Sequence, residues 1–93
     1  MLPLPNDPCC SVHFELLADA EPGLLPRVLA PFAKRDLVPD QVHARREGTA
    51  LLVEVGMEAM PSGMMHLVES NLRQIVGVRR VAAVLREERR WAA

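Results

Sequence analysis

Five side chains in this 93-residue sequence could act as nucleophiles, general bases or metal ligands: Cys9, Cys10, His13, His43 and His66. Cys10 and His13 are three positions apart, so in an extended strand their side chains point to opposite faces. Adjacent cysteines suit neither an ordinary structural disulfide nor half of a zinc site. We therefore predict no catalytic residue and no metal site. The histidines are expected on polar faces, and Cys10 as a small buried residue.

The segment 57–66 holds four methionines beside His66. Thioether sulfurs can ligate soft metals, which is one interpretation of this cluster. The interpretation we favour is adaptable apolar packing, because methionine fills irregular gaps in cores and interfaces. The arginine pairs at 45–46 and 79–80 could meet an anion or an acidic partner, but such pairs usually remain solvated.

Residues 19–25, Asp-Ala-Glu-Pro-Gly-Leu-Leu, form a candidate site for a carboxylate. Pro22 suits the first position of a helix, where its missing N–H costs nothing, and Gly23 has no Cβ to hold a ligand away from the backbone. The N–H groups at a helix start and the helix macrodipole both favour a negative ligand. The alternative is that Pro-Gly here only marks a turn.

The hydrophobic pattern on either side of this segment predicts the elements that position it. Alternating apolar residues over 10–18 indicate a half-buried strand. Apolar residues at helical spacing then indicate a helix over 22–35. Pro31 lies inside that helix and should kink it, at a cost of roughly 3 kcal/mol unless packing compensates.

The second half of the sequence predicts a hairpin, a helix and a last strand. Strands over 37–44 and 50–56 flank a polar turn at 45–48, and Pro39 makes the first of them an edge strand. Residues 57–61 are a connection. A helix capped by Ser62 then runs to about Ile75 and is closed by Gly77, and a strand follows over 78–85.

This order predicts an α+β fold of the ferredoxin-like type, βαββαβ, with a four-stranded antiparallel sheet and two helices on one face. The domain spans 9–86, between an N-terminal arm at 1–8 and a C-terminal tail at 87–93. The uncovered face keeps four apolar residues, which either form a partner surface or are scattered exposed side chains. They are Leu17, Leu52, Ala82 and Val84.

Composition excludes several classes of function. A formal net charge of −1 gives no electrostatic footprint for nucleic acid or for an anionic membrane. The three aromatic residues, Phe14, Phe32 and Trp91, are too few for a base-stacking surface. No apolar run approaches the roughly 20 residues of a membrane span. We expect a cytoplasmic protein with reduced thiols.

Two stretches resemble a known family. Glu-Pro-Gly-Leu-Leu at 21–25, with Arg-Val-Leu at 27–29 and Phe32, resembles the first turn and helix of ACT domains. Asn-Leu-Arg-Gln-Ile-Val-Gly-Val at 71–78 resembles the second helix and last strand of the small regulatory subunit of acetolactate synthase. The resemblance spans about residues 10–85.

The resemblance implies a regulatory module that binds an amino acid, forms a homodimer or higher oligomer through its sheets, and modulates a large thiamine-dependent catalytic subunit. Thiamine diphosphate, flavin and magnesium would belong to that partner, and this chain would need no cofactor. Alternatives are a stand-alone amino-acid sensor and a small ferredoxin-like enzyme that uses His13 or a cysteine. The implied ligand-binding residues are Ala20, Glu21, Pro22, Gly23, Leu24 and Val38.

Within that set, the resemblance gives Gly23 and Leu24 the backbone N–H groups that would meet the ligand's carboxylate. Ala20 and Val38 stand where valine-sensitive members carry asparagine. Loss of both amides removes side-chain donors and acceptors for an amino acid's polar ends. The resemblance therefore implies a branch that activates and stabilises its catalytic partner rather than sensing valine.

Overall fold

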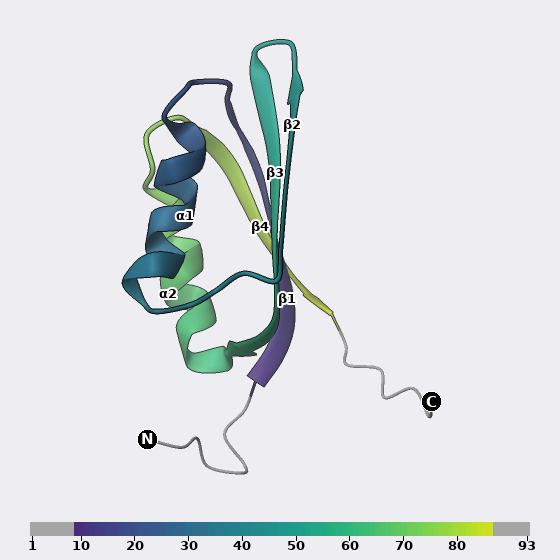
Figure 1. Ribbon diagram of the computed structural model, residues 1–93, viewed down its shortest axis with the longest axis vertical. Coiled ribbons are helices and arrows are strands. Elements are labelled where there is room, and N and C mark those ends of the chain that lie inside the picture. The colour runs from purple at the N-terminus through teal and green to yellow at the C-terminus, as the bar shows by residue number, and fades with distance from the viewer. Residues whose placement is uncertain (1–8, 87–93) are drawn as a thin grey trace.

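The computed structural model describes residues 9–86, and in it two helices lie on one face of a four-stranded antiparallel sheet (Figure 1). The elements are β1 (Cys9–Asp19), α1 (Leu24–Lys34), β2 (Gln41–Glu47), β3 (Ala50–Pro61), α2 (Ser62–Arg73) and β4 (Val78–Arg86). The strand order is β2-β3-β1-β4. The predicted βαββαβ fold is therefore confirmed. The arm and tail predicted at 1–8 and 87–93 lie outside the described residues.

The core lies between the central strands and the helices. Every second residue of β1 points into it, and Phe14 meets Phe32 of α1 edge to face with ring centroids 5.6 Å apart. Each large apolar side chain buried in this way contributes about 1.5–3 kcal/mol relative to exposure. The β1 contribution consists of Val12, Phe14, Leu16 and Ala18.

The open face of the sheet carries the four apolar residues expected there, but they do not form one patch. Leu17 lies directly opposite Leu52, and in the next row Glu15 lies directly opposite Glu54. Ala82 pairs with Glu15 from the other side. Arg80 and Arg45 flank the two leucines on either side, and His43 pairs with Glu54. Apolar and charged side chains are therefore mixed on this face.

The chain between α1 and β2 differs from the prediction. The strand expected over 37–44 begins only at Gln41, and the turn expected at 45–48 lies at Gly48 and Thr49. Asp36 has a positive φ of 56° and reverses the chain after α1. Pro39 therefore precedes the strand instead of lying within it. β2 is an edge strand, as Pro39 had indicated.

The connection predicted at 57–61 is wrong, because these residues continue β3. A bulge between the pairs that Cys10 and Val12 make with β3 shifts the register by one residue. As a result Met57 and Met60 both enter the core, at 5% and 0% exposure. Strict alternation cannot reveal a strand across such a shift. The packing interpretation of these two methionines is confirmed.

A side chain caps the bulge. The Glu58 N–H donates to Asp40 Oδ2 at 2.7 Å, while the Asp40 N–H donates to the Gly56 carbonyl at 2.8 Å. A Cβ at Gly56 would lie 3.2 Å from His13 Nε2, so any larger residue there would require the His13 ring to shift. Asp40 thus fixes both the start of β2 and the bend of β3.

The helix ends also differ slightly from expectation. α1 starts at Leu24, two residues later than predicted, and continues through a buried Pro31 whose packing offsets the missing hydrogen bond. Pro61, not Ser62, is the N-cap of α2, which has no side-chain cap. Gly77 adopts a φ of 100° after α2, in agreement with its predicted role.

Replacing Asp40 tests the cap on the bulge. Asp40→Ala should lower the free energy of unfolding by about 1 kcal/mol, because it removes a charge-assisted hydrogen bond to the Glu58 N–H. Asp40→Asn keeps an acceptor oxygen and should recover most of that loss. The measurement is urea denaturation. Glu47→Ala is the control, since its exposed ion pair with Arg45 contributes little; equal losses in Asp40→Ala and Glu47→Ala would contradict the cap.

Candidate functional site

The turn between β1 and α1 is held by backbone hydrogen bonds to two other loops. The Asp19 N–H donates to the Gly77 carbonyl at 2.8 Å, and the Ala20 N–H donates to the Thr49 carbonyl at 3.0 Å. The turn therefore lies at the end of the sheet where the β2–β3 hairpin turns and where α2 leads into β4 (Figure 1). Three connections far apart in the sequence meet at this corner.

Gly23 is the N-cap of α1, and its φ of −92° is accessible to any residue. Its role is therefore one of space. A Cβ added at Gly23 would lie 3.2 Å from Nη2 of Arg27. The absence of a side chain at Gly23 lets the Arg27 guanidinium lie close to the backbone of the turn.

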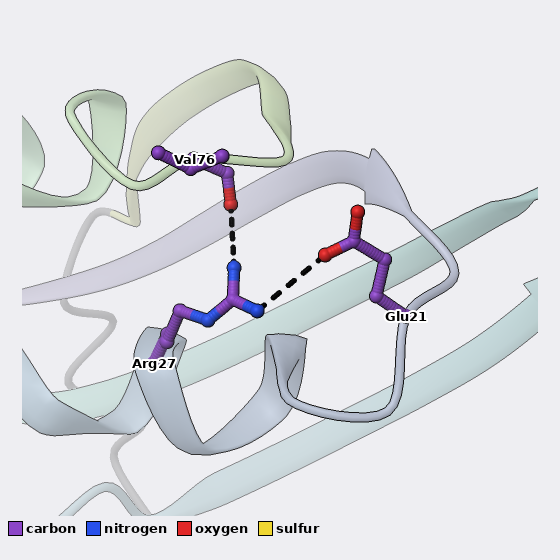
Figure 2. A network of polar contacts seen from close by, with 3 residues as sticks. All are labelled: Glu21, Arg27 and Val76. Atoms are coloured by element: carbon purple, nitrogen blue, oxygen red, sulfur yellow. Dashed lines mark hydrogen bonds and ion pairs between the residues drawn. The ribbon is translucent and has the colours of Figure 1, made fainter.

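Arg27 joins the turn to the segment after α2 (Figure 2). Its Nη1 donates to the Val76 carbonyl at 2.9 Å, and its Nη2 lies 3.4 Å from Glu21 Oε1. Both charged side chains are a little over two-fifths exposed, so a ligand in solution can reach them. A positioned guanidinium of this kind can hold a carboxylate through charge-assisted hydrogen bonds.

The backbone donors expected for the carboxylate are only partly available. The Leu24 N–H already donates to the Glu21 carbonyl at 3.1 Å, and the Leu24 side chain is fully buried in the core. A carboxylate approaching Gly23 would thus meet the Arg27 guanidinium before the backbone. Sequence reasoning used Arg27 only for the family resemblance. Its spacing of four residues from Gly23, on one helix face, was the signal that could have identified it.

The other implied site residues are divided between two ends of α1. Ala20, Glu21 and Pro22 share the corner with Gly23, whereas Val38 lies in the loop after α1 and is 80% exposed. An α-helix of 11 residues is about 16 Å long. One copy of the chain therefore does not bring Val38 to the turn.

The cysteines and histidines do not converge. The Cys10 thiol points to the helix side and contacts the Met60 carbonyl at 3.6 Å, while His13 lies over Gly56 on the open face. Burial, and secondarily the neighbouring Cys9, raise the pKa of the Cys10 thiol. Thiolate, the reactive form, is thereby disfavoured. Within residues 9–86, no three His, Cys, Asp or Glu side chains are grouped to hold a metal ion.

Comparison with known families finds a match over most of the chain. The model of the ACT-like domain matches residues 5–89. The chain belongs to the ACT-like domain family. No curated protein matches the chain. As an ACT-like domain it is a regulatory module of the amino-acid-binding type. Among the described residues, neither helix combines the length and the apolar character needed to cross a membrane.

The two thiols of this ACT-like domain should differ in reactivity. In Cys9→Ser the remaining Cys10 thiol should react with Ellman's reagent more slowly at pH 8 than the Cys9 thiol does in Cys10→Ser. The reason is that desolvation raises the pKa of Cys10 and leaves less thiolate at a given pH. Its rate should also keep rising to a higher pH. Equal rates in the two variants across pH 7–10 would contradict this assignment.

Proposed function

We propose that this ACT-like domain is a small regulatory subunit, which binds and modulates the large catalytic subunit of a cytoplasmic acetolactate synthase in branched-chain amino acid biosynthesis. The proposal is supported by the family match and by the resemblance of 21–29 and 71–78 to that subunit. It assigns no chemistry to this chain. Thiamine diphosphate, flavin and magnesium are assigned to the catalytic partner.

The observation that carries the proposal is the position of the Arg27 guanidinium over Gly23. Two fixed contacts, with the Val76 carbonyl and with Glu21, hold the cation at the mouth of the β1–α1 turn. An amino acid has a carboxylate that this cation can pair with. We assign the ligand's carboxylate to Arg27 and to the backbone around Gly23.

A second copy of the chain completes the proposed site. Val38 and the turn lie at opposite ends of α1, so both can touch one ligand only across an interface. β2 is an edge strand whose residues are all exposed, which leaves a row of backbone groups open to pairing. We therefore propose a homodimer or higher oligomer with the ligand at the seam between copies.

The competing functions predict different partners. A stand-alone sensor would be stabilised by one free amino acid without any large subunit. A subunit of the synthase would co-purify with a large thiamine-dependent enzyme and change its turnover. An enzyme that uses His13 would lose turnover in His13→Ala while its fold stays intact, and that result would overturn both regulatory proposals.

The glycine of the turn gives a direct test of the ligand site. Gly23→Val should displace the Arg27 guanidinium and weaken amino-acid binding by at least about tenfold, because a hydrogen bond to a charged group contributes about 1.5–3 kcal/mol. The measurement is calorimetric titration of the protein with branched-chain amino acids, alone and with its catalytic partner.

Gly63→Val is the matched control, since a Cβ at Gly63 meets no atom within 4 Å. It should leave the amino-acid affinity unchanged. Gly23→Val with unaltered affinity would remove the site from the turn. If neither amino acids nor a large thiamine-dependent synthase bind the wild-type protein, the proposed function is wrong.

A further inference from the structure

A groove of about 490 Å³ lies between α1 and the C-terminal end of α2. Pockets of about 300–1,000 Å³ are the usual size for small-molecule sites. One stripe of α1 forms the first wall: Arg27, Ala30, Pro31 and Lys34. The end of α2 and the turn after it form the second wall: Asn71, Gln74, Ile75 and Val76.

The first wall has a cation at each end and an apolar middle. Arg27 and Lys34 are seven residues apart on one face of α1, which corresponds to about 10 Å along the helix. Ala30 and Pro31 lie between them. None of the lining residues is acidic. Across residues 9–86 Lys34 has no ion-pair partner, so its charge is available to a ligand.

The second wall supplies apolar surface and amides. Val76 is 79% exposed, so its side chain offers apolar surface to a ligand in the groove. Its carbonyl holds Arg27 in place at 2.9 Å, so that end of the groove is preorganised. Asn71 and Gln74 add amide donors and acceptors that can orient an anionic group.

We propose that this groove binds an elongated organic dianion, an α,ω-dicarboxylate whose two carboxylates pair with Arg27 and Lys34. Its aliphatic middle lies on Ala30, Pro31 and Val76. Positions 27 and 34 are about 10 Å apart along α1, and an α,ω-dicarboxylate of about six to eight carbons is of comparable length. This site goes beyond the proposed amino-acid site at the turn, and the two sites share Arg27 alone.

Lys34 is the one lysine of the sequence, which makes it a direct reporter. Reductive methylation with ¹³C-formaldehyde labels its amino group, together with the α-amino group, and keeps the charge of both. The Lys34→Met variant identifies the lysine signal. Titration with suberate should shift the Lys34 methyl signal in a saturable way. Suberate should bind about fivefold more tightly than octanoate, which has the same chain length and one carboxylate, because one exposed ion pair contributes up to about 1 kcal/mol.

Two variants that each remove one positive charge distinguish binding in the groove from non-specific attraction between suberate and the protein. By calorimetry, Lys34→Met should weaken suberate binding about fivefold and abolish its preference over octanoate. Arg80→Met removes an equal charge from an exposed position of β4, away from the groove, and should leave suberate binding unchanged. Non-saturating shifts, no preference for the dianion, or equal losses in both variants would overturn the proposal.

The same experiments keep this proposal separate from the amino-acid site. Lys34→Met should not change amino-acid binding, because Lys34 lies at the other end of α1 from the turn. Suberate binding with no amino-acid binding would leave the groove assigned and the proposed function wrong. The reverse pattern would overturn the groove alone.

Discussion

The structure depends on how β1 leaves the sheet. This strand is paired on both sides, and at its end the Asp19 and Ala20 N–H groups donate to carbonyls of two other loops. Those bonds fix the direction in which α1 begins, and hence the face of α1 that carries Arg27. The hydrogen bond from the Arg27 guanidinium to the Val76 carbonyl then joins α1 to the segment after α2. Backbone hydrogen bonds thus determine where Arg27 lies, and its exposed ion pair with Glu21 contributes little to that position.

Much of this arrangement could be predicted from the sequence because buried and exposed residues alternate along β1. Phe14 and Leu16 identify the buried face of β1, and Gly77 identifies the end of α2. Local rules failed at the bulge in β3. The one-residue shift near Met57 and Met60 breaks the period of two, and it depends on Asp40, a residue from another loop. Contacts between distant segments leave no periodic signal.

The candidate site divides in the same way. The Pro-Gly turn was identifiable from residue types, since a helix start and a missing Cβ are local properties. The spacing of Arg27 from Gly23 indicates that it lies near the turn, but its contact with the Val76 carbonyl, 49 positions away, leaves no local signal. Leu24 had been expected to offer its N–H, but a bond within the turn occupies that group. Residue type predicted the location of the site, while the binding groups follow from tertiary structure.

Glu15 and Glu54, which lie opposite each other, affect how another surface can contact the open face of the sheet. A flat and wholly apolar sheet surface would bind many other surfaces and would favour aggregation. The carboxylates of Glu15 and Glu54 must lose water before another protein surface can cover them. This desolvation is unfavourable unless the incoming surface carries cations opposite them. Covering this face closely is therefore least costly for a surface that places cations opposite Glu15 and Glu54.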